Sequence, residues 1–278
     1  MIEAIEIQTA SHCNGRCIIC PHESVSKTLS QGVMSDELFE KILPQLKGIK
    51  RIIPYFNNEP FLDQKFADRL KMIRAAYPHA ELEIATNCSM LDRNMQSRIQ
   101  GIKIDELRLS IFGFNKDTHG KVMKGLDWHN VKRNLDCLVK NKKLIKSIGQ
   151  AGIVMIDHPL LTEEDVRLAK EYCKKNSLDF NLWGFFDRSS NVKTFSNGVN
   201  RNKVNGCEQD RPLKRMHVTY EGKVVLCCMD WKQEYVLGDL NLNSIEEVWK
   251  SEKYEAIRKA IYGGGCPPYL CRRCKLSQ

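Results

Sequence analysis

Apolar and polar positions along the first two thirds of the chain switch repeatedly between the period of a strand and the period of a helix. Residues 4–8 alternate as a strand does, and the positions after Ser35 repeat at helical spacing, with Ser35 as the predicted N-cap. The same pattern predicts strands at 51–55, 81–86, 106–112, 148–156 and 180–183, and helices at 63–76, 92–99, 128–141 and after Thr162. About six strand–helix units indicate an α/β fold whose parallel sheet is covered by helices, either open or closed into a barrel.

The pattern changes near residue 187. Residues 187–206 are rich in Ser, Asn, Lys and Gly, which is typical of a linker or a surface excursion. Two strand-like segments, 215–220 and 223–227, then flank Glu221-Gly222 and predict a hairpin, and residues 244–261 predict one helix. We therefore expect a large α/β domain over residues 1–190 and a small domain over residues 191–278.

Composition indicates an ordinary soluble protein. The 278 residues are 42% hydrophobic and 28% charged, and they include no apolar run of membrane-spanning length. The start of the sequence is acidic and lacks the pattern of a signal peptide, so we expect a cytoplasmic protein without a membrane partner. The net charge is +9, but its densest basic run, residues 140–146, contains no aromatic residue. That run is typical of a solvated helix end, and nucleic acid is not an expected partner.

The cysteines are unevenly placed. Of the 12, three lie within residues 13–20 and six within residues 207–274. A reducing cytosol keeps thiols free, so this pattern is not that of a disulfide framework. Clustered cysteines in such a protein indicate a metal site or catalysis.

The first group, Cys13, Cys17 and Cys20, follows the first predicted strand, at the edge where parallel α/β folds place their active sites. Thiolates are the usual ligands of iron–sulfur clusters, and three of them would hold a [4Fe–4S] cluster with one iron left open. That iron could chelate the amino and carboxylate groups of S-adenosylmethionine (SAM). A zinc site completed by His12 or His22 is the alternative that spacing alone leaves open.

The triplet after the first strand, the later Glu-Pro pair and the strand–helix order together resemble the radical SAM superfamily. The resemblance covers essentially the whole chain and implies a partial (β/α)6 barrel, SAM as cofactor and a SAM-binding [4Fe–4S] cluster. Both glycines of the family's Gly-Gly-Glu-Pro motif are replaced here, and Ile19 stands where the family usually has an aromatic residue. By position, the resemblance implies these cofactor-binding residues: Asn57, Asn58, Glu59, Pro60, Asn87 and Ser110.

The second group consists of four potential metal ligands: Cys207, Cys227, Cys271 and Cys274. A zinc knuckle or ribbon would suit this spacing. Within a radical SAM chain, however, the pattern resembles the twitch domain, a shortened SPASM domain, and implies one auxiliary [4Fe–4S] cluster. Four cysteines would leave no open iron, which suits electron transfer better than substrate binding. Cys228 and Cys266 lie near this group and are candidate hydrogen donors, spare ligands or bystanders.

These features predict a radical SAM oxidoreductase that forms a 5′-deoxyadenosyl radical to remove hydrogen from a substrate carbon. The auxiliary-cysteine spacing is similar to that of the family's aminocyclitol dehydrogenases, which implies oxidation of a sugar, polyol or aminocyclitol alcohol. The expected partners are this small molecule and a reductant such as flavodoxin or ferredoxin. Modification of a ribosomal peptide is the alternative enzyme activity, and a non-catalytic iron–sulfur or zinc scaffold is a third interpretation. No residue is assigned as the general base.

Overall fold

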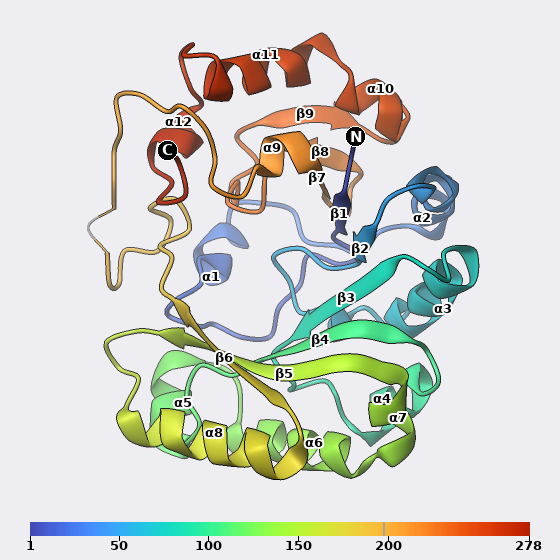
Figure 1. The fold of residues 1–278 in the computed structure, drawn as a ribbon, viewed down its shortest axis with the longest axis vertical. Coiled ribbons are helices and arrows are strands. Elements are labelled where there is room, and N and C mark those ends of the chain that lie inside the picture. Colours follow the sequence, from blue (N-terminus) through green and yellow to red (C-terminus); the bar gives the residue numbers. More distant parts are fainter. Residues whose placement is uncertain (197) are drawn as a thin grey trace. The chain divides into compact units, whose positions relative to one another are not determined.

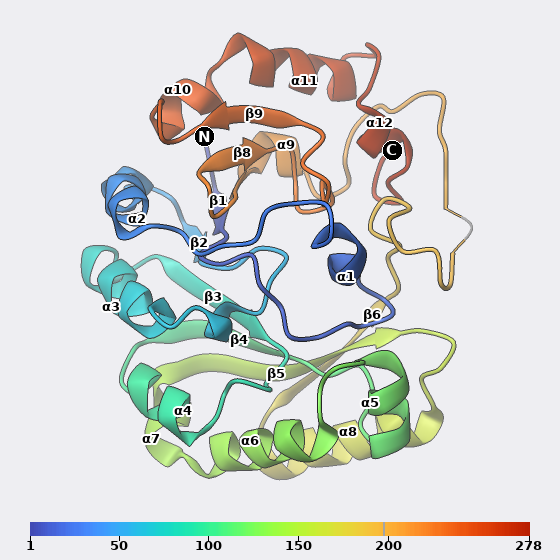
Figure 2. The same cartoon turned by 180° about the vertical axis from the view of Figure 1, so that it is seen from behind.

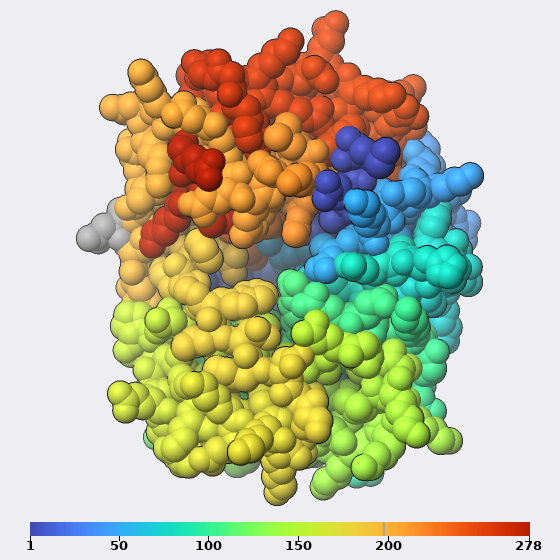
Figure 3. Space-filling model, in the orientation of Figure 1, coloured from blue at the N-terminus to red at the C-terminus, as the bar shows by residue number. Residues whose placement is uncertain are grey.

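A computed structural model describes residues 1–196 and 198–278. The chain forms two compact units, each assembled from segments that are distant in sequence. The first unit contains Met1–Ser11, Ile19–Asn57 and Phe186–Gln278; the second contains His12–Ile18 and Asn58–Phe185. Figure 3 shows the N-terminal residues of the first unit (dark blue) beside C-terminal residues (orange to red). The two units do not correspond to two consecutive stretches of the chain. The predicted domain boundary between residues 190 and 191 stays a prediction.

The second unit is a parallel α/β structure. Its strands pair in chain order as β3 (Glu81–Thr86), β4 (Ile104–Ser110), β5 (Ile148–Asp157) and β6 (Asp179–Gly184), all parallel. Helices cover one face of this sheet (Figures 1 and 2): α3 (Phe66–Ala76), α4 (Arg93–Ile99), α5 (Lys116–Val122), α6 (Trp128–Lys140), α7 (Lys142–Ser147) and α8 (Glu163–Asn176). A short 3-10 helix, η2 (Pro60–Leu62), precedes α3.

The two faces of this sheet differ in chemistry because side chains alternate along a strand. On β4, Leu107 and Leu109 are fully buried. Between them, Arg108 contacts Glu106 at 2.7 Å and Glu83 of β3 at 2.7 Å. Arg108 and Glu106 line a cavity with residues of β5 and β6. The face of the sheet that packs against the helices is therefore apolar, and the opposite face is polar.

The first unit contains the remaining strands. Strand β1 (Ala4–Ile7) runs parallel to both β2 (Arg51–Ile53) and β7 (Arg215–Val218), and β8 (Lys223–Val225) and β9 (Val236–Asp239) continue the sheet antiparallel. Its helices are α1 (His22–Val25), α2 (Asp36–Ile42), η1 (Leu43–Leu46), α9 (Arg211–Lys214), α10 (Ile245–Trp249), α11 (Glu252–Tyr262) and α12 (Tyr269–Arg272). Strand β1 thus joins the first strand–helix segment to the C-terminal hairpin within one sheet.

Most predicted elements are confirmed. Ser35 caps α2 by accepting from Leu38 N, and Thr162 caps α8 in a capping box with Asp165. The predicted strands are present, although β4 begins two residues earlier than expected. The hairpin of β7 and β8 is confirmed, and no helix or strand forms among the described residues of 187–206.

One predicted helix is wrong. The segment 244–261 forms two helices, α10 and α11, because Ser251 adopts an extended conformation and accepts from Tyr254 N as a new N-cap. The hydrophobic spacing continues across the break, so periodicity alone did not reveal it. Helices α5 and α7 and strand β9 were not predicted. In the described part of the chain, no helix combines the length and apolar character needed to cross a membrane.

His119 of α5 is expected to make the fold sensitive to acid. It is fully buried, and neither ring nitrogen has a hydrogen-bond partner among the described residues. Burial lowers its pKa from 6.5 to about 4, with a smaller opposing effect from Asp127. The unfolded chain therefore binds more protons than the folded chain between these values. Stability is fully present above the unfolded pKa and falls as the pH drops toward the folded one.

We expect the free energy of unfolding to fall by about 1 kcal/mol between pH 7 and pH 5.5 through His119 alone. His119→Phe keeps the ring packing against Trp128, at 5.1 Å between centroids, but removes the titration. Anaerobic denaturant unfolding of both proteins at the two pH values measures the difference. An equal pH dependence in the two proteins would contradict this role of His119.

Candidate active site

The loop that carries the first cysteine group follows β1 directly. Gly15 N donates to Cys13 Sγ at 3.4 Å, and a Cβ at Gly15 would lie 3.4 Å from Cys17 Sγ. A larger side chain at this position would therefore crowd the Cys17 sulfur atom and Leu126. The loop is held by Arg16 N and Ile18 N, which donate to the carbonyls of residues 124 and 122. Cys13 and Cys17 belong to the second unit and Cys20 to the first, and all three thiols are partly exposed.

Glu59 organises the second unit around this loop. Its carboxylate is 1% exposed and accepts from Thr86 Oγ1 at 2.7 Å, from Asn87 N at 2.7 Å and from Phe61 N at 3.3 Å. Its own backbone N donates to the carbonyl of His12 at 2.9 Å. Burial raises the pKa of Glu59 to about 7, although the three donors favour the ionised form. Glu59 thus fixes both the end of β3 and the residue before Cys13.

Asn87 continues this network to the cysteine loop. Its Nδ2 donates to Asn14 Oδ1 at 3.1 Å and lies 4.0 Å from Cys13 Sγ. Its Oδ1 accepts from Ser89 Oγ at 2.6 Å, and Asn14 Nδ2 donates to the same hydroxyl at 2.8 Å. Glu59, Asn87 and Cys13, all predicted site residues, are therefore connected by hydrogen bonds. Asn14 and Ser89 were not predicted; the position of Asn14 between two cysteines was the one available signal.

The other predicted residues lie around this network. Pro60 is buried at the start of η2, Asn58 is half-buried beside Glu59, and Ser110 ends β4, the neighbour of β3. Asn57 belongs to the first unit. The roles of these residues toward a cofactor stay predictions.

Asn57 explains how this chain replaces a glycine of the family motif. Its φ is +55°, in the left-handed region that asparagine tolerates better than most other residues. Its Nδ2 donates to the carbonyl of Cys228 at 3.3 Å, and Gln8 Nε2 donates to the neighbouring carbonyl of Phe56 at 2.8 Å. The asparagine therefore keeps the glycine conformation and adds a contact to the C-terminal hairpin.

Substitutions of Asn57 should separate these two contributions. Asn57→Gly keeps the backbone conformation, so we expect SAM affinity within about threefold of the parent. Asn57→Val forces a β-branched residue into the left-handed region and should weaken SAM binding about tenfold or more. Anaerobic calorimetry with SAM measures both affinities. Equal affinities for the glycine and valine variants would contradict the conformational requirement.

The second cysteine group lines one cavity in the first unit. Cys207, Cys227, Cys271 and Cys274 all border it, together with Arg211, whose buried Nε has no hydrogen-bond partner among the described residues. Burial raises the pKa of Cys271 to about 12, and it also raises the pKa of Cys274. Four crowded thiols beside an unpartnered guanidinium nitrogen form a donor set suited to an anionic metal cluster.

The chain forms this cavity by folding its C-terminal tail back on itself. Glu208 N donates to the carbonyl of Leu276 at 2.9 Å, and Cys207 and Ser277 form an antiparallel bridge. Ser277 Oγ donates to the carbonyl of Cys271 at 2.7 Å. The first two of these contacts join residues separated by more than sixty positions. Cys266 is exposed and Cys228 is half-buried, and neither lines the cavity in the described structure.

Comparison with known families agrees with this geometry. The profile of the radical SAM superfamily matches residues 7–173. The chain belongs to the radical SAM superfamily. A second profile, that of the SPASM iron–sulfur cluster-binding domain, matches residues 207–275, which contain all four cysteines of the cavity. The resemblance inferred from the sequence is therefore confirmed, and so is the predicted radical SAM fold, a partial (β/α)6 barrel with a small C-terminal iron–sulfur domain.

Individual relatives extend the comparison. The chain is 25% identical, over 99% of its length and 93% of the relative, to an S-adenosyl-L-methionine-dependent 2-deoxy-scyllo-inosamine dehydrogenase from Niallia circulans. It resembles the crystal structure of BtrN with AdoMet and 2-DOIA, with a TM-score of 0.66, 20% identity and coverage of 99% and 93% of the two chains. Streptococcus suis SuiB bound to its precursor peptide gives a TM-score of 0.72 at 12% identity, covering 99% and 70%.

Membership of the family supplies the cofactors. Radical SAM enzymes bind SAM and a [4Fe–4S] cluster, and the SPASM domain binds auxiliary iron–sulfur clusters. The residues present suit these groups. The three thiols of the cysteine loop are partly exposed, and the C-terminal cavity gathers four thiols and an arginine nitrogen that has no hydrogen-bond partner among the described residues. Sequence reasoning missed Arg211, because the sequence shows no signal that brings it to the cysteines.

Proposed function

We propose that this radical SAM enzyme oxidises a secondary alcohol of an aminocyclitol or a related polyol to a ketone. The observation that carries the proposal is the single cavity with four cysteines, which suits one fully ligated auxiliary cluster. The dehydrogenase from Niallia circulans, aligned over nearly the whole of both chains, supports the same class of substrate.

In this proposal Cys13, Cys17 and Cys20 hold the SAM-binding cluster. When bound, this cluster and SAM supply a 5′-deoxyadenosyl radical, which removes a hydrogen atom from carbon. The network of Glu59, Asn87 and Asn14 keeps the cysteine loop at a fixed place relative to the end of β3. Such positioning is the protein's main contribution to a reaction that its own polar side chains could not perform.

The C-terminal cysteines account for the rest of the oxidation. Conversion of an alcohol to a ketone removes two electrons and two protons, and loss of one hydrogen atom leaves one electron and one proton to be taken. Cys207, Cys227, Cys271 and Cys274 would hold one cubane with no iron left open, and that cluster would supply an electron acceptor that does not bind substrate. Arg211 lines the same cavity, and its positive charge would favour the reduced, more negative state of the auxiliary cluster.

We further propose a flavodoxin or ferredoxin as the electron donor, because the SAM-binding cluster must be reduced before each cleavage. We also propose a cytoplasmic location. Peptide modification remains the alternative activity. SuiB shares the fold but at 12% identity, whereas the sequence relationship is to a small-molecule dehydrogenase.

The test is anaerobic turnover with both clusters reconstituted, SAM and a chemical reductant. 2-Deoxy-scyllo-inosamine, the compound in the relative's name, and other amino and neutral cyclitols are the substrates, with Ser- and Cys-containing peptides as comparison. The proposal predicts one ketone per deoxyadenosine from a cyclitol. Deoxyadenosine without any ketone, or oxidation of a peptide instead, would overturn it.

A further inference from the structure

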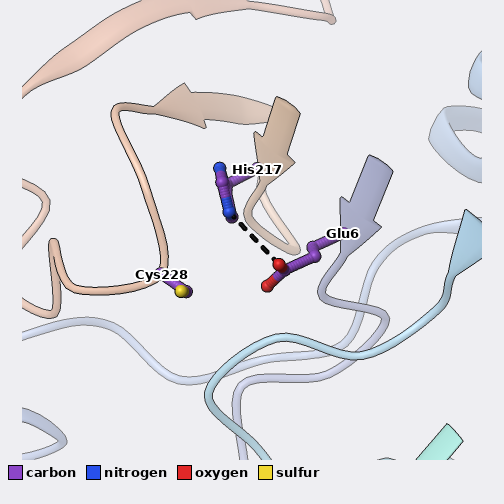
Figure 4. A group of neighbouring side chains, drawn as sticks. All are labelled: Glu6, His217 and Cys228. Atoms are coloured by element: carbon purple, nitrogen blue, oxygen red, sulfur yellow. Dashed lines mark ion pairs between the residues drawn. The ribbon is translucent and has the colours of Figure 1, made fainter. Parts of the chain in front are cut away.

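Three metal-binding side chains converge in the core of the first unit, outside the cavity with the four cysteines. Glu6 comes from β1, His217 from β7 and Cys228 from the segment after β8 (Figure 4). One ligand atom from each lies within 4.8 Å of the others. Glu6 is 8% exposed and His217 is completely buried. The three elements are distant in sequence, so only the fold brings these donors together.

His217 and Glu6 lie close together without a hydrogen bond between them. The Nε2 of His217 lies 3.3 Å from Glu6 Oε1, yet neither ring nitrogen makes a hydrogen bond among the described residues. A nitrogen that close without an aligned hydrogen bond is unusual for a buried ion pair. The edge between N and O in a tetrahedral zinc site is about 3.4 Å, given Zn–N and Zn–O bonds of roughly 2.1 Å. The observed separation matches a nitrogen and an oxygen aimed at a shared ion.

We propose that Glu6, His217 and Cys228 bind one Zn²⁺ ion, separate from the iron–sulfur clusters. Carboxylate oxygen, imidazole nitrogen and thiolate sulfur are the three ligand types that zinc uses in proteins, and water can complete the tetrahedron. The ion would link β1, β7 and the residue next to Cys227, a predicted cluster ligand. Its role is therefore to hold the hairpin that carries the auxiliary cluster.

The Glu6 carboxylate and a Cys228 thiolate would together balance the charge of a dication. Burial opposes ionisation of Glu6, but His217, Arg211 and Arg215 outweigh it and hold its pKa at about 2. Arg215 Nη1 lies 3.5 Å from Glu6 Oε1 and orients it from outside, as second partners of metal ligands do. Zinc binds the neutral imidazole and the thiolate, so any proton on the ligating atoms of His217 and Cys228 would leave as the ion binds.

The site is distinct from the cavity with the four cysteines. Cys227 lines that cavity, whereas Cys228 does not. Cys228 lies in the turn that follows β8, where Asp230 N donates to the Cys227 carbonyl at 2.9 Å. Asn57 Nδ2 donates to the Cys228 carbonyl at 3.3 Å and so helps to hold that residue in place.

The test is zinc binding by the reconstituted enzyme under anaerobic conditions. The protein, carrying about eight irons, is incubated with Zn²⁺, desalted and analysed for both metals. We expect about one zinc per chain at unchanged iron content, and X-ray absorption at the zinc edge should show one sulfur at about 2.3 Å with nitrogen and oxygen ligands at about 2.0–2.1 Å. Cys228→Ala and His217→Gln should each lower the retained zinc about tenfold, whereas the control Cys137→Ala should not.

Two results would overturn the proposal. One is a zinc content below about a tenth of an ion per chain in the parent enzyme with its iron intact. The other is a four-sulfur zinc shell, which would place the ion on unfilled cluster cysteines. Because the absorption spectrum is taken on the parent enzyme, the test stands even where a variant fails to fold.

Discussion

The Cys271→Ala enzyme is expected to keep cleaving SAM while losing the ability to form ketone. Cys271 lines the C-terminal cavity and has no part in the cysteine loop after β1. Its loss removes one of four proposed ligands of the auxiliary cluster, so iron should fall from about eight to about four per chain. Without an electron acceptor, ketone formation should drop about 100-fold or more, roughly 2.7 kcal/mol. Deoxyadenosine formation should remain within about threefold of the parent.

Anaerobic turnover with separate quantification of deoxyadenosine and ketone measures this uncoupling. Cys137→Ala is the matched control, because Cys137 is a half-buried cysteine of α6, outside both cysteine groups. It should keep both products and all its iron. If Cys271→Ala still forms ketone in proportion to deoxyadenosine, the auxiliary cluster is not the electron acceptor.

The Cys17→Ala enzyme is expected to fail at the earlier step. Removing this thiol leaves two of the three proposed ligands of the SAM-binding cluster, so that cluster should not assemble. Deoxyadenosine should fall about 1,000-fold or more, because the protein has no other route to reductive cleavage. The auxiliary cluster should survive, and iron should again fall to about four per chain.

The two variants are therefore expected to have the same iron content and opposite product patterns. Electron paramagnetic resonance of the reduced proteins should distinguish them, since addition of SAM should change the signal of Cys271→Ala and leave that of Cys17→Ala unchanged. A SAM-dependent signal in Cys17→Ala would show that this cysteine is not a cluster ligand.

Much of the fold could be predicted because local signals agreed with the tertiary structure. The caps at Ser35 and Thr162 accept from the backbone as their sequence positions indicated. The alternation of strands and helices also predicted a parallel sheet, and β3–β6 are parallel. The break between α10 and α11 was missed because hydrophobic spacing continues through it, while the competing cap at Ser251 is local.

The candidate site was less accessible from sequence, for a different physical reason. Cysteine spacing identified both groups of candidate metal ligands, because binding to one metal centre restricts how far apart ligands lie in the sequence. Arg211 and the trio of Glu6, His217 and Cys228 carry no such spacing. They meet only because β1 pairs with β7 within one sheet. The positive φ of Asn57 likewise became visible only in the structure, and it explains a departure from the family motif.

The central claim is that the radical removes hydrogen from the carbon that becomes the ketone. Turnover of a cyclitol deuterated at that carbinol carbon tests it directly. The account predicts one deuterium in each deoxyadenosine, formed in equal amount with the ketone. Undeuterated deoxyadenosine, with the deuterium retained in the substrate or released to water, would contradict it.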